Sequence, residues 1–204
     1  MIKMADIVYE FGGSLYLNIT NECPCDCVFC VRNIKDTMGT GNNMWHEKAP
    51  TFEEIKAAVD ATDFTGYDSI VFCGYGEPTC ELENLIKTAK YLKEKYGLKI
   101  RVNTNGLGSL YNGRDITDEF CEYVDSVSVS LNAADKEKYL KITRNKFGLE
   151  SFDAMLEFTK KCVEKGLSAR MTVVDILTPE EIEKCAGIAR SIGAKFDARS
   201  LIKE

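Results

Sequence analysis

The chain has 204 residues and a formal net charge of −6, and 45% of its residues are hydrophobic while 28% are charged. This length allows one domain with a sizeable core. The acidic balance argues against broad electrostatic binding to nucleic acid or to an anionic membrane, and no apolar run is long enough to cross a bilayer. The first ten residues lack the apolar core of a signal peptide, so we expect a cytoplasmic protein whose nine cysteines stay reduced.

Segments typical of strands and of helices alternate along the rest of the chain. Residues 6–10 and 14–20 are predicted to pair as a hairpin across Gly12 and Gly13. Five further runs rich in β-branched residues are predicted strands: 69–74, 99–104, 126–131, 169–176 and 196–202. Helix signals lie between the strands: capping boxes at Thr51 and Thr178, a C-terminal cap at Gly97, an N-terminal cap at Ser151, and short helices near Phe120 and over residues 135–144.

Six strands separated by helices predict right-handed crossovers and a parallel sheet. Six such units are too few to close the eight-unit barrel, so we expect an α/β fold, a partial and open (βα)6 barrel. No shift in composition marks a second domain, and we expect a single core domain over residues 1–204 with little or no C-terminal extension. Active sites in such folds lie at the carboxyl ends of the strands, where the functional motifs should therefore be sought.

The first predicted parallel strand is followed by Cys23, Cys27 and Cys30, spaced C-x3-C-x2-C. Soft thiolates on a short loop select an iron–sulfur cluster or zinc. Three thiolates can hold three irons of a [4Fe–4S] cluster, and because the usual full set is four cysteines, one iron is then open for chemistry. The alternative is a four-cysteine zinc site that also uses Cys25. Zinc sites commonly take two separated cysteine pairs, however, and no second pair stands at a suitable spacing.

An aromatic residue, Phe29, directly precedes the last of these cysteines, and the whole loop resembles the cluster loop of radical S-adenosylmethionine (SAM) enzymes. In that resemblance Cys25 is not a ligand, and we expect a buried thiol beside the cluster. The next strand ends in a second motif that resembles the element holding the amino group of SAM, with a tyrosine carbonyl in the place of a glycine carbonyl: Gly74, Tyr75, Gly76 and Glu77, followed by Pro78. Alone, this motif could be an ordinary strand-to-helix turn.

Polar side chains also stand at the next two strand ends. Asn103 or Asn105 is expected to bind the methionyl part of SAM, the alternative being a plain Asn-Gly turn. Ser130 and Asn132 lie two residues apart on a strand and therefore face one side. The resemblance implies that they contact the carboxylate and the ribose of SAM.

The last two strands offer weaker candidates. Val173 and Val174 would line the adenine through their backbone and apolar side chains, with core packing an equal alternative. Arg199 is the basic residue best placed to pair a carboxylate of SAM or of a substrate, and the alternative is an exposed arginine at a sheet edge. Trp45 and His46 are interpreted as a surface pair rather than a lid over the cluster. The remaining cysteines are assigned to the core (Cys121, Cys162 and Cys185) or to the neighbourhood of the glycine motif (Cys73 and Cys80).

The chain as a whole resembles the TatD-linked family of radical SAM proteins. The matching runs are residues 11–12, 14–16, 18–21, 23–25, 72–79, 103–106, 113–117 and 130–133. The resemblance implies that the amino and carboxylate groups of SAM bind the open iron, and that one electron cleaves the sulfonium to a 5′-deoxyadenosyl radical. That radical would take a hydrogen atom from a substrate that the sequence does not identify.

The partners expected from this resemblance are a flavodoxin- or ferredoxin-like electron donor and a TatD-type nuclease. Because the sequence ends soon after the sixth parallel strand, we expect the open side of the barrel to face a macromolecular substrate or a partner protein. Two alternative functions stay open. One is a radical activase of a partner protein, and the other is an iron–sulfur electron carrier or sensor that does not turn over SAM.

Overall fold

The computed structural model describes residues 5–38 and 41–201, and within these residues seven strands form one sheet in the order β1-β2-β5-β6-β7-β8-β9. The hairpin partner β1 is antiparallel to β2, and every other neighbouring pair is parallel. The strands are β1 (Val8–Phe11), β2 (Ser14–Leu17), β5 (Ser69–Phe72), β6 (Lys99–Thr104), β7 (Ser126–Ser130), β8 (Ser168–Val174) and β9 (Lys195–Arg199). A separate small hairpin pairs β3 (Thr37–Met38) with β4 (Asn42–Asn43).

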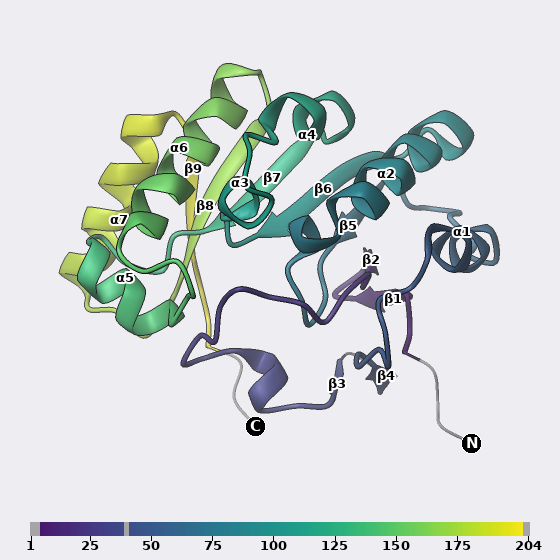
Figure 1. Ribbon diagram of the computed structural model, residues 1–204, viewed down its shortest axis with the longest axis horizontal. Coiled ribbons are helices and arrows are strands. Elements are labelled where there is room, and N and C mark those ends of the chain that lie inside the picture. The colour runs from purple at the N-terminus through teal and green to yellow at the C-terminus, as the bar shows by residue number, and fades with distance from the viewer. Residues whose placement is uncertain (1–4, 39–40, 202–204) are drawn as a thin grey trace.

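Helices connect the strands and cover one face of the sheet. They are α1 (Phe52–Asp60), α2 (Leu82–Tyr96), α3 (Gly108–Tyr111), α4 (Thr117–Tyr123), α5 (Lys136–Thr143), α6 (Glu150–Glu164) and α7 (Pro179–Ile192), with short 3-10 turns η1 (Val31–Asn33) and η2 (Pro78–Glu81). Figure 1 shows the α-helices arrayed outside the curved sheet, while the segment that carries η1, β3 and β4 lies on the other side. None of the helices in the described part of the chain is long and apolar enough to span a membrane.

The predicted α/β fold is confirmed, since six parallel strands follow one another in chain order with helices between them. β1 and β9 form the two edges of the described sheet, so the barrel stays open. The predicted strand at residues 196–202 overlaps β9, but β9 ends at Arg199, and Ile202 lies outside the described residues.

Successive residues of each strand point to opposite faces, and the two faces differ in chemistry. On β6, Ile100 and Val102 are fully buried in the core beneath the helices, whereas Arg101 and Asn103 line a cavity on the other side. On β8, Met171 is likewise buried while Arg170 is exposed. We call the first side the helix-covered face. The second is the open face, whose residues include Tyr16, Arg101, Asn103, Ser128, Arg170 and Arg199.

The helix ends agree with the sequence except at one position. Thr51 and Thr178 form complete capping boxes, and Gly97 ends α2 in the left-handed conformation with φ +67°. The prediction that Ser151 caps the next helix is wrong, because α6 begins at Glu150 and Ser151 already lies in its first turn. Its hydroxyl donates to the carbonyl of Gly148 at 2.6 Å, and the helix has no side-chain cap.

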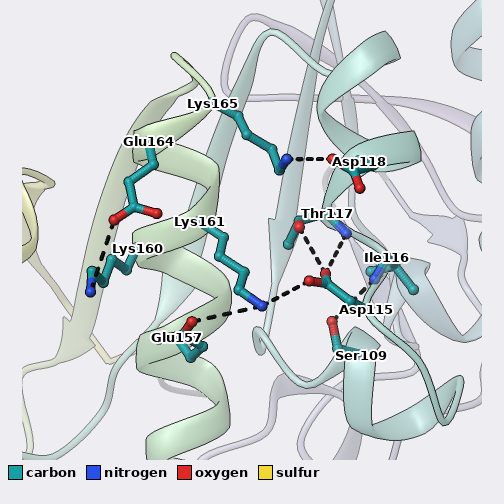
Figure 2. Close-up of polar contacts among 10 residues, drawn as sticks. All are labelled: Ser109, Asp115, Ile116, Thr117, Asp118, Glu157, Lys160, Lys161, Glu164 and Lys165. Carbon is teal, nitrogen blue, oxygen red and sulfur yellow. Dashed lines mark hydrogen bonds and ion pairs between the residues drawn. The ribbon is translucent and has the colours of Figure 1, made fainter.

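Charged side chains join the C-terminal end of α6 to the N-terminal end of α4 (Figure 2). Lys161 pairs with Asp115 at 2.8 Å, and Lys165 pairs with Asp118. The Asp115 carboxylate also accepts from the backbone N–H and the hydroxyl of Thr117. The Lys161 ammonium, with the Thr117 hydrogen bonds, lowers the pKa of Asp115 to about 2. These pairs are exposed, so each stabilises the packing of the helices only slightly.

Candidate functional site

The cysteine loop leaves the carboxyl end of β2 and is held by the backbone at the end of α5. The N–H of Asp26 donates to the carbonyl of Thr143 and the N–H of Val28 to that of Ile142, both at 3.0 Å. Within the loop, the N–H of Cys30 donates to the carbonyl of Cys27 at 3.0 Å. Main-chain bonds therefore fix the path of this short loop, and its side chains remain available for a ligand.

Arg32, which the sequence analysis did not single out, joins the cysteine loop to the glycine motif. Its guanidinium donates to the carbonyl of Cys25 at 3.1 Å, and to those of Asn21 and Tyr75 at 3.4 Å each. The planar five-donor group of arginine suits this bridging of several carbonyls. No sequence pattern links position 32 to position 75, so this contact is visible only in the folded chain.

The four thiols of the loop differ in their electrostatic surroundings. Hydrogen bonds to the thiols of Cys23 and Cys27, together with burial, raise the pKa of Cys25, so Cys25 keeps its proton. The bond from that thiol lowers the pKa of Cys23, and the Arg32 charge adds to the effect. Burial raises the pKa of Cys30.

Two cavities adjoin the cysteine loop. The first, of about 190 Å³, is lined by these residues of the sequence prediction: Cys23, Cys27, Phe29, Gly76, Glu77, Asn103, Asn105, Ser130, Asn132 and Arg199. The second, of about 260 Å³, adds Cys30 and Val174. The folded chain thus brings most of the predicted residues to one place, while Gly74, Tyr75 and Val173 do not line either cavity.

The two glycines of the 74–77 motif are required by close packing against residues 18–22, which lead from β2 into the cysteine loop. A Cβ atom on Gly74 would lie 2.7 Å from Cγ of Asn18, and one on Gly76 would lie 2.7 Å from the carbonyl oxygen of Glu22. Either side chain would push the loop away from β5. Tyr75 turns its ring away from the cavities, where it packs against Trp45 with ring centroids 5.2 Å apart. Tyr75 can therefore meet a ligand only through its backbone.

Glu77 is buried, and its carboxylate holds neighbouring residues of the site by hydrogen bonds. One carboxylate oxygen accepts from the N–H and hydroxyl of Thr79 and from the hydroxyl of Thr104, at 2.6–3.1 Å. The other accepts from the N–H of Asn105 at 2.7 Å. Burial raises the pKa of Glu77 while these hydrogen bonds oppose the rise. Since a carboxylate offers about four acceptor positions, the second oxygen can still accept one further donor.

Two buried polar atoms at the first cavity have no hydrogen-bond partner among the described residues. They are Oδ1 of Asn103 and the hydroxyl of Tyr139, which lines the cavity from α5. Buried polar atoms are normally paired, so an unpaired set around one cavity indicates a bound ligand. Tyr139 was missed in the sequence because nothing there places the predicted helix 135–144 against the cysteine loop.

Asn105, Asn132 and Arg199 also line the cavities beside the cysteine loop. Asn105 accepts from the N–H of Leu107 at 2.8 Å, and its amide nitrogen lies 3.6 Å from Sγ of Cys25. Asn132 has φ +58°, a left-handed conformation that asparagine tolerates well. Arg199 donates to the hydroxyl of Ser128 at 2.7 Å, so it reaches over the open face instead of extending from the edge.

The valines and the tryptophan–histidine pair are placed differently from the cavity rim. Val173 is 1% exposed and packs in the core of the helix-covered face, so only Val174 turns its side chain toward the site. Trp45 donates to Asp36 at 3.3 Å, and Nε2 of His46 lies 2.9 Å from the carbonyl of Asn18. Burial lowers the pKa of His46, so the neutral ring donates to that carbonyl. Neither residue lines the two cavities, which agrees with a surface pair.

The remaining cysteines divide as the sequence predicts. Cys162 and Cys185 are fully buried, and Cys121 packs against the core. Cys73 lines the first cavity, where Asn103 contacts its thiol, and burial raises its pKa. Cys80 is half-buried behind the glycine motif.

The positions of the thiols bear on the kind of metal group that they could hold. Among the described residues, no group of three or more His, Cys, Asp or Glu side chains is placed to hold one metal ion. In a [4Fe–4S] cluster each thiolate binds a different iron, so the thiols must surround a space instead of converging on a point. Cys23 and Cys27 border the first cavity, and Cys27 and Cys30 border the second, so Cys27 is common to both.

Comparison with known proteins places this geometry in context. The sequence model of the radical SAM superfamily matches residues 17–187. A probable GTP 3′,8-cyclase from Methanococcus aeolicus is 28% identical over 85% of this chain and 52% of its own length. A putative glycyl-radical enzyme activating enzyme from Methanocaldococcus jannaschii is 28% identical over 80% of this chain and 63% of its own. The chain thus spans about half to two thirds of the length of these relatives.

The fold is also found in solved structures. Streptococcus suis SuiB, bound to its precursor peptide SuiA, superposes with a TM-score of 0.68 at 15% identity, over 92% of this chain and 39% of that one. The structure of SuiB bound to S-adenosylmethionine superposes with a TM-score of 0.62. At this level of identity the likeness concerns the fold alone.

Proposed function

This chain belongs to the radical SAM superfamily, and we propose that it is an enzyme that reductively cleaves S-adenosylmethionine at a [4Fe–4S] cluster held by Cys23, Cys27 and Cys30. The observation that carries this proposal is the cavity between the cysteine loop and the strand ends, which contains two buried polar atoms without partners. When bound, the cluster and SAM supply one-electron cleavage of the sulfonium, which gives a 5′-deoxyadenosyl radical able to take a hydrogen atom from a substrate.

The protein's own part is to bind and orient SAM. We assign its amino group to the backbone of Tyr75 and Gly76 and to the remaining acceptor position of Glu77. Gly74 acts indirectly, because its lack of a side chain lets this strand end lie against Asn18. The planar ring of Phe29, beside the last cysteine, would exclude water from the cluster side of the cavity.

The opposite rim would hold the rest of SAM. We assign the methionyl part to Asn103 and Asn105, whose amides border the cysteine loop. The carboxylate and ribose are assigned to three further residues of the rim: Ser130, Asn132 and Arg199. The adenine would lie along the end of β8, against the backbone of Val173 and the side chain of Val174.

The direct test is anaerobic reconstitution with iron and sulfide, followed by addition of SAM and dithionite. We expect 5′-deoxyadenosine and methionine in equal amounts, formed only when the reductant is present. A reconstituted cluster that changes its absorbance with dithionite but yields neither product would support the electron carrier or sensor instead. A reconstituted protein with no cluster absorbance would contradict both functions.

A radical activase of a partner protein is the second candidate function. The similarity to the putative glycyl-radical enzyme activating enzyme, over 80% of this chain, supports it. The two candidates differ in the source of the hydrogen atom. Transfer of deuterium into 5′-deoxyadenosine from a labelled small molecule would support the enzyme on a small substrate, whereas transfer from a labelled partner protein would support the activase.

We further propose that the chain is a TatD-linked member of the superfamily, and that residues 1–204 form one core domain in a cytoplasmic protein. The sequence runs that resemble this family support the assignment, among them Asn103–Gly106 and Ser130–Ala133. A flavodoxin- or ferredoxin-like protein would then deliver the electron, and a TatD-type nuclease or another macromolecule would meet the open side. Reduction of the cluster by purified flavodoxin, and co-purification with a TatD-type nuclease, test these partners separately.

A further inference from the structure

A third cavity, of about 270 Å³, lies on the open face below the proposed cofactor site, and basic side chains surround it. The residues that matter are Arg101 on β6, Arg170 on β8, and Lys195 and Arg199 on β9. Four positive side chains from three strands of the sheet gather here, although the chain as a whole carries a formal net charge of −6. Such a local concentration attracts anions into the cavity.

Within the described residues the basic groups are only partly neutralised. Arg170 pairs with Asp197, and Arg199 is hydrogen-bonded to the neutral hydroxyl of Ser128. The side chain of Arg101 makes no hydrogen bond or ion pair within the described residues, and its Nε atom is buried without a partner. The side chain is half-buried, and a buried donor without an acceptor destabilises the folded protein, so the unpaired Nε indicates a ligand that accepts from it.

This cavity continues into the proposed cofactor site. Asn103, Ser128 and Arg199 line both the third cavity and the cavity beside the cysteine loop. The hydrogen bond from Arg199 to Ser128, at 2.7 Å, holds the guanidinium across the boundary between them. A molecule bound among the basic residues would therefore lie directly against the place proposed for SAM.

We propose that Arg101, Arg170, Lys195 and Arg199 form an anion site, which binds a phosphate or carboxylate group of the substrate. This anion site rests on the proposed function, because the substrate atom that loses hydrogen to the radical would lie next to the bound anionic group. Arginine recognises both phosphate and carboxylate through two parallel N–H groups, which fixes the orientation of the bound molecule as well as its place. The substrate class is therefore an anionic molecule that carries a phosphate or a carboxylate group.

The test measures binding of two anions, inorganic phosphate and malonate, to the reconstituted protein without SAM or reductant. We expect one or both to raise the melting temperature in proportion to concentration, compared with sodium chloride at equal ionic strength. Preference for phosphate would identify a phosphorylated substrate, and preference for malonate a carboxylate. Arg101→Gln should weaken the binding by about 10-fold or more, as expected for a hydrogen bond between charged groups.

A matched control removes the same charge elsewhere. Arg190 on α7 is exposed and pairs with Glu183, so Arg190→Gln should bind the anions as the unaltered protein does. The ligand-free melting temperature separates the two roles of Arg101. If Arg101 serves ligand binding, Arg101→Gln melts at the same or a higher temperature. If it only stabilises the fold, the variant melts lower and binds both anions normally.

Two outcomes overturn the anion site. One is that neither anion stabilises the protein beyond sodium chloride, and the other is that Arg101→Gln binds them as well as the unaltered protein. Because the measurement needs no SAM cleavage, it separates failure of the anion site from failure of the proposed function.

Discussion

The same strands form both faces of the sheet, but one face is an apolar core and the other carries polar side chains. On the helix-covered face, Ile100 and Val102 are fully buried in a continuous apolar core. One residue away, Arg101 and Asn103 leave buried polar atoms without partners. The first face therefore stabilises the fold, whereas the second keeps hydrogen-bonding capacity for a ligand at a cost in stability. Substitutions on the helix-covered face should therefore lower stability, and substitutions on the open face should weaken ligand binding.

The largest effect is expected at the cysteine loop, on the open side. Cys27→Ala should abolish cluster absorbance and SAM cleavage, because one iron loses its protein ligand. The helix-covered core is untouched, so the far-ultraviolet circular dichroism should not change. Cys25→Ala is the matched control and should retain the cluster, since Cys25 is interpreted as a buried donor. Loss of the cluster in Cys25→Ala with the other three cysteines intact would show that the ligand assignment is wrong.

Met171 and Arg170 are adjacent on β8 but lie on opposite faces of the sheet, so they test the difference in stability between the two faces. Met171→Ala should lower the free energy of unfolding by about 2–5 kcal/mol, because the buried side chain leaves a cavity in the core. Arg170→Ala removes only an exposed ion pair with Asp197 and should cost about 0–1 kcal/mol. Urea denaturation of both variants measures the difference. Equal costs would mean that the two faces do not divide stability in this way.

Two tyrosines test the unpaired hydroxyl. Tyr139→Phe removes a hydroxyl that has no partner in the described structure, so stability should change by less than about 0.5 kcal/mol. If that hydroxyl binds SAM, the affinity for SAM should fall by about 2- to 10-fold, the value of one hydrogen bond. Isothermal titration with the reconstituted protein measures this affinity.

Tyr9→Phe is the matched control, since the Tyr9 hydroxyl donates to the carbonyl of Cys73 at 3.0 Å. That variant should lose about 0.5–1.5 kcal/mol of stability while its SAM affinity stays unchanged. A stability loss in Tyr139→Phe as large as that in Tyr9→Phe, without an effect on SAM, would show that the Tyr139 hydroxyl is structural.

A small, pH-dependent effect concerns the exposed pair of Lys161 and Asp115 on the helix side of the sheet. The pKa of Asp115 lies at about 2, below its ordinary value of 3.8, mainly because Lys161 pairs with it. The pair therefore stabilises the protein above pH 4, and this contribution is lost as the pH falls from about 4 to about 2. Asp115→Asn should cost less than about 1 kcal/mol at neutral pH, because the pair is exposed. Melting curves should show the gap between the two proteins narrowing in that acid range, and a constant gap would contradict the assignment.

Much of the fold could be predicted because local signals agree with it. The β-branched runs, the capping boxes at Thr51 and Thr178, and Gly97 lie within single elements, and the structure contains each of them. The exception, Ser151, resembles a cap locally, but the preceding turn at Gly148 has already begun the helix. Strand ends could be predicted as the place of the site because parallel strands share one carboxyl edge.

The rest of the site depends on contacts between distant parts of the chain. Arg32 meets Tyr75, Arg199 meets Ser128, and Tyr139 lies beside the cysteine loop. No local propensity encodes these contacts, since they arise only when the sheet has ordered its strands. The alternation of basic and apolar residues in residues 99–102 is visible in the sequence, but its meaning depends on which face the helices cover.

The backbone bonds between the cysteine loop and α5 also affect when the protein can receive its metal. Asp26 and Val28 depend on Thr143 and Ile142, and the N–H of Lys146 closes the same contact on the carbonyl of Pro24. A ribosome adding about 5–20 residues per second completes that partner many seconds after the cysteines emerge. During this interval the thiols are on an unshaped loop that can bind stray metals or oxidise. A chain interrupted before residue 146 therefore carries Cys23, Cys27 and Cys30, the ligands proposed above, without the backbone partners that shape their loop.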